Sequence, residues 1–179
     1  IGLSDSDVLE CCAEASKTGP VEAVNFNSPG QVVIAGEKKA LAKAIELVKA
    51  KGCRRAIELA VSGPFHSSML KPAGEKLAAR LAEVALSVPE IPVSANVDVK
   101  PLANPAEIRT VLAEQVSSPV QWVKTIQKMA ADGVTDIVEC GPGKVLQGLI
   151  RRIAPEIRIY GISDAATLAA ALEKLKAAQ

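Results

Sequence analysis

Apolar residues recur at regular spacings through the first third of the chain. Val8 and Cys12 lie four positions apart after Ser4, a residue type that favours a helix N-terminus, and Gly19-Pro20 ends the helix that they predict. The same periodicity predicts a second helix around residues 41–48, which Gly52 ends. Apolar runs predict strands at residues 22–26, 31–35 and 55–61.

A turn-forming segment separates the first two predicted strands. Asn27-Ser28-Pro29-Gly30 contains the proline and glycine that supply turn dihedrals, so we expect a β-hairpin. The order helix, strand, strand, helix, strand lacks only a leading strand to form the ferredoxin-like fold, and Ile1-Gly2-Leu3 could be the end of that strand. The sequence therefore predicts a ferredoxin-like small subdomain at residues 1–61, with most of its first strand missing upstream.

From residue 62 onward, longer helices alternate with short strands. Such alternation favours a parallel sheet with covered faces, hence the α/β class and a second, larger domain over residues 62–179. Strands are expected at residues 91–97, 135–140 and 158–162, and helices at residues 70–84, 108–116, 120–131, 144–153 and in the alanine-rich C-terminal segment.

The composition predicts a globular protein and argues against several classes of partner. Hydrophobic residues make up 49% of the 179 positions, which supports a packed core. Because 21 basic residues nearly cancel 20 acidic ones and only 2% are aromatic, we expect no nucleic-acid surface. No apolar stretch approaches the roughly 18 residues of a membrane span, and no signal peptide is evident. We expect a soluble monomer, with further sequence upstream of Ile1.

The cysteines do not suggest a metal site. The four cysteines follow no metal-ligand spacing, and one histidine leaves too few donors for zinc. We therefore expect no metal, free thiols and a reducing, cytoplasmic location.

The single histidine, His66, follows a predicted strand and precedes a predicted helix. Loops at this position in α/β folds often carry active groups. From the pattern alone, an ordinary loop histidine, or one that satisfies a helix N-terminus, is the favoured interpretation.

His66 belongs to the first of four segments that together resemble a known family. The segments are Phe65-His66-Ser67-Ser68-Met69-Leu70-Lys71-Pro72, the hairpin at residues 24–36, Gln115 with Ser118-Pro119-Val120-Gln121-Trp122, and Glu139-Cys140-Gly141-Pro142-Gly143-Lys144-Val145-Leu146. In this order they resemble bacterial malonyl-CoA:acyl carrier protein transacylases. The likeness runs from residue 1 to about residue 153, and four motifs in succession are far more specific than one.

The resemblance implies the C-terminal part of an α/β-hydrolase-like acyltransferase domain with an inserted ferredoxin-like subdomain. It also implies transfer of malonyl from CoA to a serine, and from the serine to the phosphopantetheine thiol of acyl carrier protein, in fatty acid biosynthesis. The CoA thioester and the pantetheine arm are then substrates, and no bound cofactor is expected. A serine hydroxyl needs a base to become nucleophilic, and His66 has that role by the resemblance.

The resemblance assigns further residues to the site. It implies that the main-chain carbonyl of Gln115 orients the imidazole, and Gln115 also falls on the buried face of its predicted helix with Ile108 and Leu112. The remaining assignments are the pantetheine arm to Asn25 and Asn27, the edge of the cleft to Val145, and the carrier protein to Arg151 and Arg152.

One motif of this type of fold does not occur in the chain. No Gly-x-Ser-x-Gly, the turn that exposes the nucleophilic serine, is found from Ile1 to Gln179. By the resemblance, the serine and the arginine that binds the malonyl carboxylate lie upstream. We therefore expect the isolated chain to be inactive.

Gly141-Pro142-Gly143-Lys144 invites comparison with a phosphate-binding loop, because helix N-terminal amides bind anions. A Walker loop requires an earlier glycine and a serine or threonine after the lysine, and Val145 follows here. The sequence favours a tight turn.

Two other functions remain open at this stage. The chain could belong to the acyltransferase domain of a polyketide or multifunctional fatty acid synthase, which shares the fold. It could also be a non-catalytic ferredoxin-like binding module in which His66 is structural.

Overall fold

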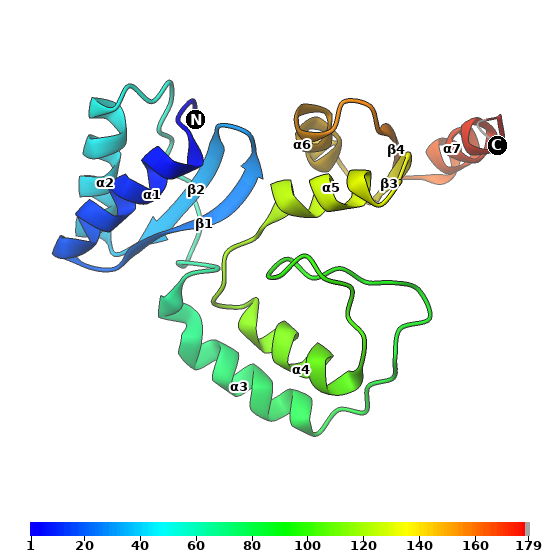
Figure 1. Ribbon diagram of the computed structural model, residues 1–179, viewed down its shortest axis with the longest axis horizontal. Coiled ribbons are helices and arrows are strands. Elements are labelled where there is room, and N and C mark those ends of the chain that lie inside the picture. The colour runs from blue at the N-terminus through cyan, green and yellow to red at the C-terminus, as the bar shows by residue number, and fades with distance from the viewer. Residues whose placement is uncertain (178–179) are drawn as a thin grey trace. The chain divides into compact units, whose positions relative to one another are not determined.

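The computed structural model describes residues 1–177. Ile1–Thr125 form one compact unit, and the described residues from Ile126 onward form a second. Figure 1 labels the elements. The helices are α1 Asp5–Ala15, α2 Lys38–Ala50, α3 Lys71–Ala82, α4 Pro105–Glu114, α5 Trp122–Ala131, α6 Val145–Ile153 and α7 Ala165–Ala177, with 3₁₀ turns η1 Ser16–Thr18 and η2 Ser68–Leu70. The strands are β1 Val21–Ser28, β2 Gln31–Gly36, β3 Asp136–Cys140 and β4 Arg158–Ile162.

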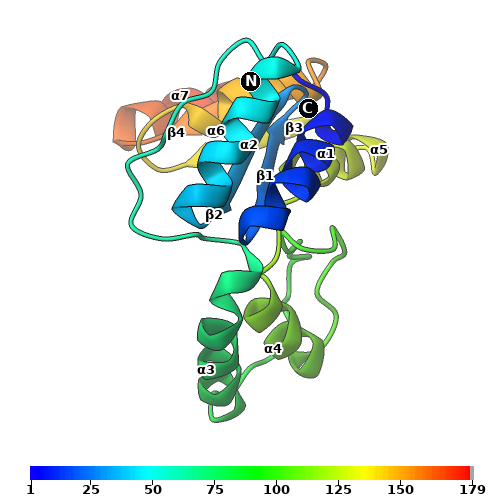
Figure 2. The ribbon, with the colours of Figure 1, turned by 90° about the vertical axis from the view of Figure 1, so that its left-hand side faces the viewer.

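The first unit begins with the predicted hairpin and its two helices. Strands β1 and β2 pair antiparallel, and α1 and α2 lie against one face of the hairpin (Figure 2). The fully buried Ala40 and Ala44 let the backbone of α2 approach closely. The buried core consists of Val8, Cys12, Ala15, Val21, Ala23, Ala40 and Ala44.

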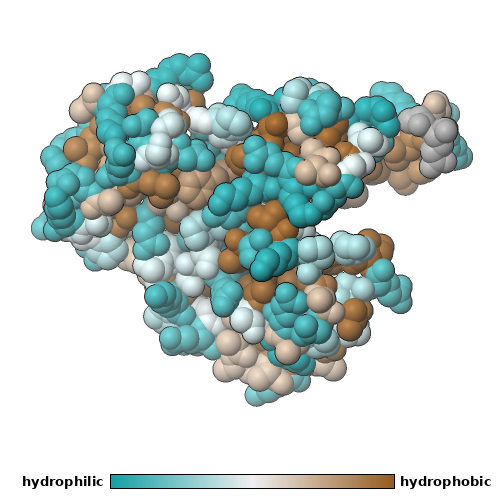
Figure 3. Space-filling view, viewed as in Figure 1, coloured by the Kyte–Doolittle hydropathy of each residue, from teal (hydrophilic) through white to brown (hydrophobic). Residues whose placement is uncertain are grey.

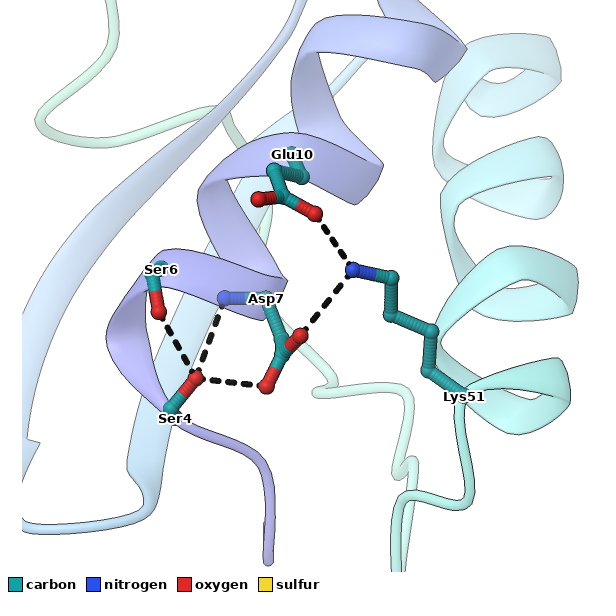
Figure 4. Close-up of polar contacts among 5 residues, drawn as sticks. All are labelled: Ser4, Ser6, Asp7, Glu10 and Lys51. Carbon is teal, nitrogen blue, oxygen red and sulfur yellow. Dashed lines mark hydrogen bonds and ion pairs between the residues drawn. The ribbon is translucent and has the colours of Figure 1, made fainter.

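Polar contacts fix the start of α1 and join it to the residue that follows α2 (Figure 4). The Ser4 hydroxyl accepts a hydrogen bond from the Asp7 amide at 3.1 Å, as an N-cap. Lys51 Nζ lies 3.0 Å from Asp7 Oδ1 and 2.5 Å from Glu10 Oε2. The hydrogen bond from Ser4, and then Lys51, lower the pKa of Asp7. Because these groups are solvent-exposed, they orient the helices more than they stabilise them.

Helices α3 and α4 pack side by side in the first unit (Figures 1 and 2). Gly74 of α3 permits this approach, because a Cβ there would lie 3.0 Å from the Ala113 carbonyl oxygen of α4. The Arg109 guanidinium donates to the carbonyls of Leu81 and Val84, at 3.0 and 2.8 Å. It thereby ties the end of α3 to α4, although the Leu81 carbonyl also accepts from the Val84 amide at 3.2 Å.

The second unit contains a β-α-β arrangement. Strands β3 and β4 pair in parallel, and α6 is the connection between them. Asp136 faces Arg158 in the strand register and binds its guanidinium through both oxygens, at 2.7 and 2.6 Å. This contact, and then one from Thr135, lower the pKa of Asp136 to about 2. The parallel pair and its crossover helix agree with the predicted α/β class.

Two predicted strands are wrong. Residues 55–61 belong to no strand, although Arg55 exchanges backbone hydrogen bonds with Ile1. Residues 91–97 contribute an isolated bridge between Ser94 and Pro101. Both segments have strand-like composition, but a strand also requires a partner backbone. Ile57, Leu59 and Val61 are consequently more than half exposed. Figure 3 shows large hydrophobic patches among the hydrophilic surface.

The other predicted helices and strands from Ser4 onward are confirmed, with ends that differ by a few residues at most sites, whereas residues 1–3 belong to no strand. The predicted domain boundary after residue 61 falls inside the first compact unit, and the division into domains stays a prediction. Across residues 1–177, no helix is both long and apolar enough to cross a membrane.

The cysteines provide a test of the packing. Burial raises the pKa of the Cys12 thiol to about 11, whereas Cys140 is exposed. Because the thiolate is the reactive form, this pKa alone should slow alkylation of Cys12 at pH 8 about 100-fold relative to an ordinary thiol. We expect iodoacetamide to label Cys140 first and Cys12 only in denaturant, as followed by peptide mass spectrometry. Equal labelling of both cysteines in the folded chain would contradict this packing.

Candidate active site

The loop before α3 holds His66 in an unusual backbone conformation. His66 has a φ of 64°, in the left-handed region that costs a residue with a side chain about 1–2 kcal/mol. Local contacts maintain this conformation. Ser67 is 1% exposed, its hydroxyl donates to the Pro64 carbonyl at 2.7 Å, and its own carbonyl accepts from Leu70 at 3.0 Å. Such conformations persist where surrounding structure fixes them, often at functional sites.

Glu22 of β1 anchors the same loop from a distance in sequence. Its carboxylate accepts hydrogen bonds from the Ser68 amide at 3.0 Å and from the Ser68 hydroxyl. Bonds to a charged acceptor are stronger than neutral ones, so this contact fixes the loop to the hairpin. Sequence reasoning missed Glu22, although a carboxylate inside an apolar strand run was a detectable signal.

The His66 ring meets the main chain at the end of α4. Its Nδ1 lies 2.9 Å from the Gln115 carbonyl oxygen. Since a carbonyl can only accept, Nδ1 must carry the proton, and a neutral ring then has its lone pair on Nε2. Gln115 is itself fixed, because its amide donates to the Val111 carbonyl at 3.0 Å as α4 ends. The arrangement gives an imidazole of defined tautomer that can accept a proton.

A cavity of about 460 Å³ adjoins this ring, and every residue that lines it belongs to the first unit. His66, Asn96 and Gln115 supply its polar side chains, and leucine and valine side chains supply the rest. A mainly apolar cavity with a few polar groups is typical of a ligand site. Asn96 was not among the predicted site residues. The apolar residues that line the cavity are Leu77, Leu81, Leu112 and Val116.

The other predicted residues lie elsewhere. Asn25 and Asn27 are half-buried on β1 and do not line the cavity, and Asn25 forms an isolated parallel bridge with Val120. In the second unit, Val145 is the first residue of α6 and is 72% exposed. Arg151 and Arg152 occupy the last turn of α6 and are exposed.

The turn at residues 141–144 does not offer helix amides to a phosphate. The Glu139 carboxylate accepts from the Leu146 amide at 3.0 Å and from the Gln147 amide at 3.3 Å. A side chain of β3 therefore occupies the N-terminus of α6, where an anion would otherwise bind. This agrees with the predicted tight turn, and Glu139 is a second residue whose contact the sequence analysis missed. Within residues 1–177, no group of three or more His, Cys, Asp or Glu side chains is placed to hold a metal.

Comparison with known families identifies the chain. Residues 4–171 match the family described as the acyl transferase domain. The chain belongs to the acyl transferase domain family. The malonyl CoA-acyl carrier protein transacylase of Escherichia coli strain K12 is 47% identical over 173 residues, which cover 97% of this chain and 56% of that protein.

Solved structures agree with the acyl transferase fold. The acyl-carrier-protein S-malonyltransferase of Burkholderia pseudomallei 1710b is 51% identical, with a TM-score of 0.94 over 97% of this chain and 56% of its own. A malonyl-transacylase solved in complex with its type II PKS acyl-carrier protein is 43% identical, with a TM-score of 0.95 over 97% of this chain and 56% of its own. The chain therefore spans little more than half the length of these relatives.

The Glu22 contact can be tested in this chain. Glu22→Gln keeps the shape of the side chain but removes the charge that holds Ser68, and bonds to charged acceptors contribute about 1.5–3 kcal/mol. We expect amide hydrogen exchange at residues 67–70 to accelerate about tenfold or more. Glu14→Gln, which changes an exposed carboxylate paired with Lys17, is the matched control. Unchanged exchange at residues 67–70 in Glu22→Gln would show that Glu22 does not fix the loop.

Proposed function

We propose that this chain supplies the general base for malonyl transfer from CoA to acyl carrier protein through a seryl ester. The observation that carries the proposal is the contact between His66 Nδ1 and the Gln115 carbonyl oxygen at 2.9 Å, beside a cavity. The similarity to malonyl CoA-acyl carrier protein transacylases supports the substrates, and the family membership supports acyl transfer. In this proposal the serine lies outside this chain.

The proposed chemistry has two balanced halves. In the first, His66 Nε2 takes the serine proton while the serine oxygen attacks the thioester carbonyl of malonyl-CoA. The tetrahedral intermediate collapses, the carbon–sulfur bond breaks, and the imidazolium returns the proton to the CoA thiolate. In the second half, the same nitrogen takes the proton of the pantetheine thiol, whose sulfur attacks the seryl ester. Collapse then forms the new thioester, and the proton returns to the serine oxygen.

The Gln115 carbonyl has two consequences for this cycle. It keeps the ring proton on Nδ1, so that Nε2 is available in each half-reaction. It also stabilises the imidazolium through a dipole, whereas Ser-His-Asp enzymes use a full negative charge. The acceptor belongs to the main chain, so its position depends on the end of α4 and not on the glutamine side chain.

This difference gives a test in the complete protein. His66→Ala should reduce both half-reactions about 10²–10⁴-fold, the usual contribution of general base catalysis. Gln115→Ala retains the carbonyl and should stay within about tenfold of the parent. The measurement is transfer of radiolabelled malonyl to the protein and to carrier protein. Comparable losses in both variants would refute the main-chain role, and turnover by the isolated 179-residue chain would refute the location of the serine.

The finer fold assignment is also a proposal. We propose that residues 1–61 form a ferredoxin-like subdomain, with Ile1-Gly2-Leu3 as the end of its first strand. Three backbone hydrogen bonds support it. The Gly2 amide donates to the Gly30 carbonyl at 2.8 Å, and the Ile1 carbonyl accepts from Arg54 and Arg55 at 2.8 and 3.2 Å. The N-terminal residues thus lie between the hairpin and the start of the 55–61 segment, where a first strand would pair with both.

We further propose that acyl carrier protein contacts Arg151 and Arg152. Both arginines are exposed on the last turn of α6, and one related transacylase is known in complex with its carrier protein. Complementary charge raises the rate of encounter with an acidic partner.

A reducing cytoplasmic location stays a prediction that the free thiols support. No observation favours either alternative function.

Charge reversal tests this surface. In the complete protein, replacing Arg151 and Arg152 together with Glu should slow transfer to carrier protein about tenfold, through the encounter rate. Formation of the malonyl-enzyme at saturating malonyl-CoA should be unchanged. The double change of Lys38 and Lys39 to Glu, on exposed positions of α2, matches the change in charge. Equal losses in the two half-reactions, or in the two double variants, would contradict the assignment.

A further inference from the structure

A second cavity, of about 310 Å³, lies within the second unit and has a different character. Three cationic side chains line it: Lys144 before α6, Arg151 in the last turn of α6, and Lys174 near the end of α7. No carboxylate is among its lining residues. We call this cavity the basic pocket.

The three cations have no internal counter-charge. Within the described part of the chain, none of their side chains makes an ion pair or a hydrogen bond. By contrast, Lys51, Lys128 and Arg158 all pair with carboxylates. The three positive charges around the pocket repel one another, and an anion bound between them would offset this repulsion by attracting all three.

The stability of α6 does not explain why a lysine, Lys144, stands at its N-terminus. Lys144 occupies the N-cap of α6, where the helix dipole disfavours a cation, and its side chain makes no capping bond. The Glu139 carboxylate already meets the first amides of α6. Any anion in the basic pocket would therefore be held by side chains and not by the helix terminus.

Gln147 supplies an independent observation. It lines the basic pocket and is only 7% exposed, yet its side-chain amide makes no hydrogen bond within residues 1–177. Gly161 leaves room for it, because a Cβ at Gly161 would lie 2.3 Å from Gln147 Nε2. Among the described residues, the only buried side-chain polar atom without a partner is Trp122 Nε1, so the Gln147 amide keeps some contact with solvent in the pocket. Its N–H groups are therefore open to an acceptor that enters the pocket.

We propose that the basic pocket binds a phosphate group, with Lys144, Arg151, Lys174 and the Gln147 amide as donors. A phosphate dianion carries twice the charge of a carboxylate and more oxygen acceptors, so it matches three cations and an amide better. The source is free phosphate or a phosphate group of CoA. The second source rests on the proposed function, whereas the first does not.

Nuclear magnetic resonance on the full 179-residue chain tests the proposal. Titration with inorganic phosphate, at constant ionic strength set by chloride, should shift the Gln147 side-chain amide and the Gly161 backbone amide. Lys144→Ala and Lys174→Ala should each weaken binding about tenfold, the effect of losing one charge-assisted contact. Lys176→Ala, an exposed change on the same helix that does not line the pocket, should have no effect.

Other ligands separate the remaining possibilities. If CoA binds more tightly than dephospho-CoA, and Lys174→Ala abolishes the difference, the ligand is the ribose phosphate of CoA. If neither binds more tightly than inorganic phosphate, the ligand is free phosphate. Shifts that chloride alone reproduces, or equal binding by Lys174→Ala and Lys176→Ala, would overturn the proposal. A glutamate-rich peptide that binds while inorganic phosphate does not would overturn the proposal and leave this surface to an acidic protein partner, as proposed for Arg151 and Arg152. His66→Ala should leave phosphate binding unchanged, so failure of the transfer mechanism would be recognised separately.

Discussion

The site in the first unit depends on one hydrogen bond, from His66 Nδ1 to the carbonyl at the end of α4. This bond joins two segments that are 49 residues apart in sequence, and it fixes both the direction and the tautomer of the ring. Its geometry requires that the loop stay in the left-handed conformation at His66 and that α4 end where it does. Glu22 meets the first requirement from β1, and the contact of Gly74 with α4 supports the second.

Local structure was predictable where local chemistry determines it. The Ser4 cap, the Pro29-Gly30 turn and the spacing of Val8 and Cys12 act over a few residues, and the elements that they predict are present. The strand predictions at 55–61 and 91–97 failed for the opposite reason. Apolar, β-branched composition describes a segment that suits a sheet, but pairing depends on backbone that is distant in sequence.

The residues of the candidate site also fall into those that the sequence identified and those that it did not. His66 and Gln115 could be selected from the sequence because a family resemblance gave their relation, and periodicity alone left His66 ambiguous. Glu22 and Glu139 were missed, although each holds a backbone segment that the site or its turn requires. Each carboxylate meets amides seven or more positions away, so a local pattern can mark the carboxylate but cannot identify the amides that it binds. The basic pocket likewise combines residues from α6, β4 and α7 that are unremarkable singly.

The Glu139 carboxylate also determines what the glycine-rich turn can become. Because this negative group is tethered within the same short β-α unit, it competes for the α6 amides as if present at millimolar concentration or above. A diffusing anion would have to displace that built-in competitor before it could use those amides. The turn therefore resembles a nucleotide-binding loop in composition, but the backbone amides that would bind a phosphate already bind Glu139. Selectivity for an anion in this unit must then come from side chains, which single substitutions can change.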